Sequence, residues 1–204
     1  MFRILSMLLL AVTLAACVGG AEPKWSPDAD VAAARFVAEG PPSITLYTVI
    51  NNHSQAGAHS GLMINASERI LFDPAGTWQH PKIPERNDVH FGITDKIKNF
   101  YIDYHARETF RVVEQTIIVS PQVAESAAAR AKAYGAVPKA QCARSVTAIL
   151  SGVPGFESIG STWFPKQVME EFGQLPGVTG RIIRDEDADK NHGVLLIQAA
   201  NAPN

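Results

Sequence analysis

The sequence contains little cysteine, no surplus of positive charge and no long apolar run after its first sixteen residues. Its 204 residues include 18 Lys and Arg against 20 Asp and Glu, so the net charge is −2. Because no stripe of basic residues is present, a nucleic-acid partner is disfavoured. A membrane-spanning helix needs about 20 apolar residues, and no segment after residue 16 supplies them. No segment repeats, and the length suits one domain with its own core.

The N-terminus has the pattern of a secretory signal. One basic residue, Arg3, precedes an apolar run over residues 4–14 that is too short to cross a bilayer. The step Leu14-Ala15-Ala16-Cys17 resembles the lipobox of bacterial lipoproteins, in which the cysteine is acylated and the chain is cut just before it. The resemblance implies a signal peptide over residues 1–16. It also implies an acyl anchor on Cys17 that holds the protein at a membrane surface.

The chain has only two cysteines, so lipidation of Cys17 would leave Cys142 as a single thiol. No disulfide within the chain would then be possible. A lone thiol in an oxidising compartment is a liability unless it is buried or used. Val18, rather than Asp, follows Cys17, which by resemblance to known lipoprotein sorting implies a periplasm-facing protein at the outer membrane.

Hydrophobic periodicity predicts an α+β domain with an antiparallel sheet packed against helices. Strands are expected at residues 43–50, 59–64, 69–73 and 109–119, and helices at residues 28–37, 95–104, 120–134, 142–150 and 163–172. Ser120 and Pro121 carry the strongest helix-entry signal, because serine caps helices and proline suits the first helical position.

The remaining segments are less regular. Residues 77–94 show no period and are interpreted as a long surface loop. Residues 178–184 and 194–198 are expected to form strands joined by an acidic turn. Residues 17–42 are interpreted as a tether with a short helix. The domain itself is expected to cover residues 43–204, with a C-terminal extension from about residue 156.

Cys142 stands at the predicted start of a helix. Free backbone N–H groups and the helix dipole at that position favour the thiolate, which is the reactive form of cysteine. The small residues Ala140 and Ala143 flank it and leave room for a substrate. The alternative is a buried, unreactive core cysteine, which is a common environment for this residue type.

His59 and Asp73 lie on the two strands of a predicted hairpin. His59 opens the first strand and could act as a general base toward a thiol brought near by folding. Asp73 ends the return strand, where its carboxylate could hold the imidazole in one tautomer. The alternatives are a strand histidine bonded to the backbone and an aspartate that forms a turn before Pro74.

The segment Ala58-His59-Ser60-Gly61-Leu62-Met63-Ile64, followed by a strand ending in Asp73, resembles the histidine half of NlpC-type papain-like hydrolases. In most of that superfamily the cysteine helix comes first. Here the histidine strand precedes Gln141-Cys142-Ala143-Arg144-Ser145-Val146, an order that resembles the circularly permuted branch with the lecithin:retinol acyltransferase-like proteins. The step Tyr134-Gly135 resembles the lead-in to the cysteine in the non-permuted branch, which makes Tyr134 a candidate for substrate or oxyanion contact. The similarity spans roughly residues 43–152.

This resemblance implies a permuted papain-like fold and a Cys142-His59-Asp73 site that hydrolyses or transfers acyl groups at amide or ester bonds. For a periplasm-facing lipoprotein, the implied substrate is a peptidoglycan peptide, and a lipid acyl substrate is the rival suggested by the permuted branch. Gln141 and Ala143-Arg144 depart from the family pattern and leave the substrate class open. The alternative from another class is a catalytically inactive binding or scaffold lipoprotein that retains the fold.

A metal site is the chemical rival of the thiol site. The chain offers His53, His59, His80, His90 and His105 as possible ligands. No His-x-x-x-His or Cys-x-x-Cys spacing is present, and the segment with His80 and His90 would have to fold over the hairpin. We therefore expect no metal and no cofactor.

Overall fold

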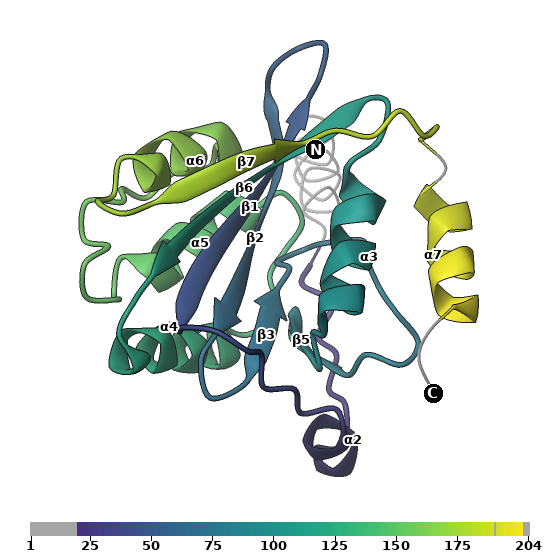
Figure 1. Cartoon of the computed structure of the whole chain (residues 1–204), viewed down its shortest axis with the longest axis horizontal. Coiled ribbons are helices and arrows are strands. Elements are labelled where there is room, and N and C mark those ends of the chain that lie inside the picture. The colour runs from purple at the N-terminus through teal and green to yellow at the C-terminus, as the bar shows by residue number, and fades with distance from the viewer. Residues whose placement is uncertain (1–19, 190, 202–204) are drawn as a thin grey trace, which may run out of the picture.

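The computed structural model describes residues 20–189 and 191–201. The predicted signal peptide and Cys17 lie outside these residues. Within the described part of the chain, no helix is long and apolar enough to cross a membrane. Figure 1 shows one twisted sheet with helices on both sides of it.

A seven-stranded sheet forms the centre of the domain, with the strand order β4-β5-β3-β2-β1-β6-β7. Every pair of neighbouring strands is antiparallel. The strands are β1 (Ser43–Asn51), β2 (Gly57–Asn65), β3 (Arg69–Phe72), β4 (Glu85–Arg86), β5 (Val89–Phe91), β6 (Phe110–Ile118) and β7 (Thr179–Ile183). The predicted α+β class with an antiparallel sheet is therefore confirmed.

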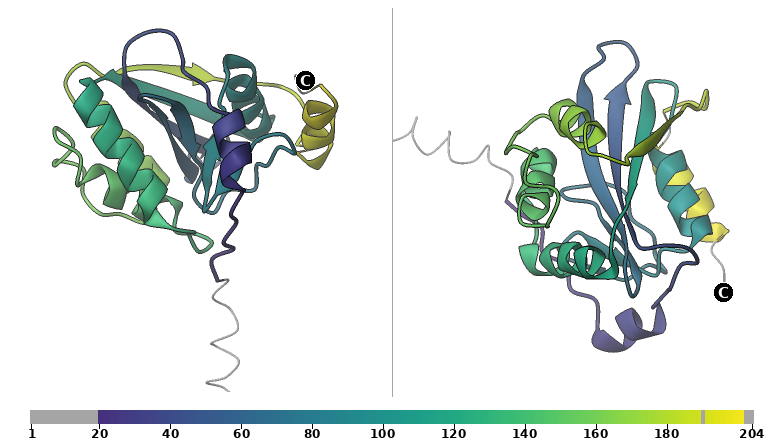
Figure 2. Two further views of the ribbon diagram at one scale, coloured as in Figure 1. Left: turned by 90° about the horizontal axis from the view of Figure 1, so that it is seen from below. Right: turned by 60° about the vertical axis from the view of Figure 1, so that its left-hand side comes forward.

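Helices cover the two faces of the sheet, as Figure 2 shows from two further directions. One face carries α4 (Pro121–Tyr134), α5 (Cys142–Leu150) and α6 (Pro165–Gly173). The other face carries α3 (Asp95–His105), against which α7 (Asn191–Ala200) packs. The short helix α2 (Asp28–Ala33) precedes the sheet.

The alternation of side chains along β1 and β2 creates two cores, one on each face of the sheet. Ile44, Leu46 and Leu62 pack against the layer of α4, α5 and α6. Tyr47 and Met63 point the other way and pack in the layer of α3. Each fully buried side chain of this size contributes about 1.5–3 kcal/mol, so both central strands are held from both sides.

Two helix starts follow the predicted chemistry. The hydroxyl of Ser120 accepts a hydrogen bond from the Val123 N–H at 3.3 Å, and Pro121 occupies the first turn of α4. Helix α5 begins at Cys142, as predicted, but no side chain caps it. Its first backbone N–H groups therefore have no side-chain acceptor at the N-cap position.

Residues 77–94 are not the surface loop that we expected. They contain β4 and β5, and they bury Trp78, His80, His90 and Ile93. The two strands are only two and three residues long. Strands this short cannot show the alternation on which the prediction depended.

The C-terminal part of the described chain confirms the strand expected at residues 178–184, which is β7, and differs from the predictions in its last element. Residues 194–198 lie in α7 rather than in a strand, because a short apolar run suits either structure. The segment after residue 156 is an integral part of the domain, since α6 packs on β1 and β7 pairs with β6. The expected tether joins the sheet edge at Trp25, which forms a β-bridge with Arg86.

Candidate active site

Three elements meet at one end of β2. Strand β3 pairs with the second half of β2, from Leu62 to Asn65, and the chain leaves the sheet at Asp73. The first half of β2, which carries His59, therefore extends beyond the end of β3. Helix α5 packs against β2, and the backbone N–H of Ser60 on β2 lowers the pKa of Cys142 on α5. The topology thus brings the three predicted residues together.

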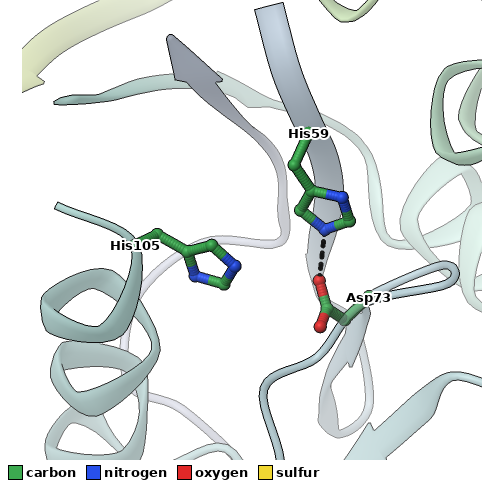
Figure 3. Close-up of side chains that lie close together, drawn as sticks. All are labelled: His59, Asp73 and His105. Carbon is green, nitrogen blue, oxygen red and sulfur yellow. Dashed lines mark hydrogen bonds and ion pairs between the residues drawn. The ribbon is translucent and has the colours of Figure 1, made fainter. Parts of the chain in front are cut away.

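The imidazole of His59 and the carboxylate of Asp73 form a short hydrogen bond. Nε2 of His59 lies 2.6 Å from Oδ1 of Asp73 (Figure 3). Because a carboxylate can only accept, Nε2 carries the proton, and Nδ1 is the ring nitrogen left to act as the base. The side chain of Asp73 is fully buried, whereas 15% of the His59 side chain is exposed.

Cys142 is the first residue of α5 and is 8% exposed. Burial raises the pKa of the thiol, but the neighbouring His59 and the backbone N–H groups of Ser60 and Ala143 lower it and outweigh burial. The pKa of Cys142 is therefore below its ordinary value, which favours the thiolate.

The charges in the site support one another. Burial lowers the pKa of His59, but the negative charges of Asp73 and Cys142 raise it to about 10. Burial also raises the pKa of Asp73, yet the neighbouring His59 holds it well below its usual range. The site therefore favours an imidazolium between a carboxylate and a thiolate, which is the charge pattern of an activated cysteine.

Tyr101 on α3 is a second partner of Asp73. Its hydroxyl donates to Oδ1 at 3.0 Å, and burial, reinforced by Asp73, raises the pKa of the phenol well above its ordinary value. A Cβ at Gly61 would lie 2.5 Å from this hydroxyl, and a Cβ at Gly76 would collide with Oδ2 of Asp73. Both glycines are thus required by the close approach of neighbouring atoms to the carboxylate.

His105, the last residue of α3, lies beside the pair. Its ring is parallel to that of His59, with 5.5 Å between centroids, and its Nδ1 lies 2.8 Å from the Tyr101 carbonyl oxygen. Burial lowers the pKa of His105 to about 4, so the ring is neutral at neutral pH.

Sequence reasoning missed Tyr101 entirely and treated His105 only as one of several scattered histidines. No local motif marks residues that reach a site from a separate helix. The available signal is their spacing of four residues, which places both side chains on one face of α3.

The remaining sequence candidates lie elsewhere. Tyr134 ends α4 and is 42% exposed, and none of its contacts in the described part of the chain reaches Cys142. His53 lies in the turn between β1 and β2, His80 contacts α7, and His90 belongs to β5. A role for Tyr134 in substrate or oxyanion contact stays a prediction.

Comparisons of the chain with protein-family models, with curated proteins and with solved structures find no match.

Proposed function

We propose that this protein is a membrane-anchored thiol hydrolase or acyltransferase that acts on amide or ester bonds. The observation that carries the proposal is the hydrogen bond between Asp73 and His59, together with the position of Cys142 at the start of α5, where its pKa is lowered by His59. In such an arrangement the imidazole activates the nucleophile, and the carboxylate holds the imidazole in the required tautomer.

In the proposed reaction, the sulfur of Cys142 attacks the carbonyl carbon of the substrate. Backbone N–H groups at the start of α5 would stabilise the oxyanion. His59 gives a proton to the leaving amine or alcohol as the C–N or C–O bond breaks, and an acyl group remains on the sulfur. Water, or an acceptor alcohol or amine, then attacks this thioester. His59 takes the proton of the attacking group, and the thiolate of Cys142 is released.

The order of the elements supports a permuted papain-like fold as the origin of this chemistry. The strand of His59 and the residue Asp73 precede the helix of Cys142, as in the permuted branch that the sequence resembles. With the lipobox at Cys17, this order favours an enzyme anchored at the outer membrane and facing the periplasm. We infer peptidoglycan peptides as its substrates, and lipid acyl groups as the rival class.

One observation favours a non-catalytic binding lipoprotein instead. Cys142 is 8% exposed, and a nucleophile must be reached by its substrate. The two functions differ in whether native protein lets a small electrophile reach the sulfur. A core cysteine would react only after unfolding, whereas a low-pKa thiolate beside a partly exposed imidazole would react in the native state.

Turnover by the full chain, purified in detergent, tests the proposal. Peptidoglycan fragments and short-chain acyl esters would be offered in parallel, and products would be followed by mass spectrometry. We expect Cys142→Ser to abolish turnover and His59→Ala to be nearly as severe, because no base then remains. His53→Ala is the matched control, since it removes an exposed imidazole from the turn that precedes β2. Full turnover in Cys142→Ser, or alkylation of Cys142 only after denaturation, would contradict the proposal.

A further inference from the structure

His59, Asp73 and His105 offer ligand atoms that all lie within 4.8 Å of one another. We propose that these three residues bind a Zn²⁺ ion, and that the bound ion silences the thiol by occupying the nitrogen with which His59 now contacts Asp73. The zinc site needs no catalytic role for Cys142, whereas the silencing rests on the proposed function.

The three side chains reach the site from separate elements. His59 comes from β2, Asp73 follows β3, and His105 ends α3. In Figure 3 a ring nitrogen of His105 points toward the pair formed by His59 and Asp73. Zinc lies about 2 Å from nitrogen and oxygen ligands, so its ligand atoms are at most about 4 Å apart. Small side-chain rotations would therefore bring the three atoms to bonding distance.

The tautomer of His105 suits metal binding. A backbone carbonyl can only accept, so the Nδ1 that lies 2.8 Å from the Tyr101 oxygen is protonated. In a neutral ring this leaves a lone pair on Nε2, the nitrogen that faces the site. Metal-binding histidines are held in this way, with the second ring N–H donated to a carbonyl or a carboxylate.

The second oxygen of Asp73 supplies an independent observation. Asp73 is 1% exposed, and its Oδ2 has no hydrogen-bond partner among the described residues. Oδ1 already accepts from His59 and Tyr101. A buried carboxylate oxygen without a partner is costly, and a cation beside it would satisfy it.

Two imidazole nitrogens and one carboxylate oxygen suit a borderline cation better than a hard one. Zn²⁺ binds such sets of three protein ligands and keeps a fourth position for water. Mg²⁺ instead prefers oxygen ligands in octahedral geometry, so it serves as the negative control. His59 and His105 are each partly exposed, which gives the ion access.

Occupation of the site changes the proton balance of His59. Without metal, Nε2–H donates to Asp73, and Nδ1 exchanges a proton with the sulfur. A zinc ion on Nε2 displaces that proton to solvent and leaves a neutral ring that carries its remaining proton on Nδ1. Such a ring is a weaker acid than the imidazolium that protonates the leaving group, and it cannot take a proton from the attacking water, so both proposed chemical steps would slow.

Zinc titration tests the site without any assay of turnover. The full chain, purified in detergent and treated with a chelator, would be titrated with zinc sulfate in competition with a chromogenic zinc indicator. We expect one ion per chain. His105→Phe keeps a flat ring beside His59 but offers no ligand, and it should weaken binding by about tenfold or more. His53→Phe is the matched control and should bind zinc as the wild type does, and so should Cys142→Ser.

X-ray absorption of the zinc-loaded wild type identifies the atoms bound to the metal directly. We expect nitrogen and oxygen neighbours. A sulfur neighbour at about 2.3 Å that disappears in Cys142→Ser would overturn the inference. So would wild-type affinity in His105→Phe, or failure of the wild type to bind zinc in preference to Mg²⁺. A metal-free protein without turnover would contradict the proposed function alone, because the titration would still stand.

Discussion

Replacing Asp73 by Asn removes the charge that stabilises the imidazolium while leaving the shape of the side chain almost unchanged. The amide oxygen can still accept from His59 and Tyr101, which bond to Oδ1 at 2.6 and 3.0 Å. The rise in the pKa of His59 from 6.5 to about 10 corresponds to about 5 kcal/mol in favour of the charged ring. Asp73 contributes most of this rise, and burial lowers the pKa once the carboxylate is gone.

We expect Asp73→Asn to lose about 2–4 kcal/mol of transition-state stabilisation, or roughly 30- to 1000-fold in turnover. The more direct assay is alkylation of Cys142 by iodoacetamide across a pH series, with each cysteine peptide quantified separately by mass spectrometry. In the wild type, labelling should stay fast toward neutral pH. In Asp73→Asn, the pH at which the alkylation rate is half its maximum should move up toward the ordinary thiol pKa of about 8.5.

Asp88→Asn is the matched control for this change. The Asp88 backbone carbonyl accepts the N–H of Asp73 at 2.8 Å, so the two aspartates are neighbours. Its backbone φ of +67° suits asparagine, and the substitution leaves the contact between Asp73 and His59 in place. A wild-type labelling profile in folded Asp73→Asn would refute the role assigned to the carboxylate.

Three further predictions concern the surroundings of the site and the anchor. Tyr101→Phe should lower the free energy of unfolding by about 1.5–3 kcal/mol in urea titrations, because a hydrogen bond to a charged group is lost. An unchanged urea midpoint would argue against a stabilising bond between Tyr101 and Asp73. Between pH 6.5 and 4 the unfolded chain takes up a proton at His105 that the folded chain refuses. Acid should therefore cost about 3 kcal/mol of stability, and His105→Phe should flatten this loss in thermal melts. Cys17→Ser should abolish incorporation of labelled palmitate, and equal labelling would rule out the anchor.

The regular elements could be predicted from the sequence because local chemistry determines them. The strand at Ser43–Asn51 is a nine-residue run rich in β-branched and apolar residues, and Ser120 marks the start of α4 by its capping hydroxyl. The strands β4 and β5 could not be found in this way. They are too short to show a local pattern, and they are strands because β5 pairs with β3 and β4 pairs with β5. Residues 194–198 were assigned to the wrong element for a related reason, because packing against α3 determines their helix.

The site was predictable to the extent that its residues stand at the ends of elements. Cys142 begins a helix, and His59 and Asp73 stand on neighbouring strands of a hairpin, so their convergence follows from short-range topology. Tyr101 and His105 reach Asp73 and His59 through the packing of α3 on the sheet, which no spacing in the sequence encodes. His59 and His105 were both weighed as metal ligands and no metal was expected, because the sequence does not show that the packing of α3 places His105 beside the other two proposed zinc ligands.

The burial of Asp73 is the feature that a purely structural account explains least well. Removing a carboxylate from water costs several kcal/mol, and an apolar residue could fill the same space at the end of β3. The chain instead holds the carboxylate with His59 and Tyr101 and keeps glycine at two positions, Gly61 and Gly76, where a Cβ would meet this group of atoms. Strongly shifted pKa values beside a specific charge partner are concentrated at functional sites. The cost of this arrangement therefore favours a chemical role for the cluster. Replacing Gly61 by Ala should disturb the labelling of Cys142, because the added Cβ would lie 2.5 Å from the Tyr101 hydroxyl that donates to Asp73. Labelling of folded Gly61→Ala at the wild-type rate and pH midpoint would show that the contact between Tyr101 and Asp73 has no influence on the thiol.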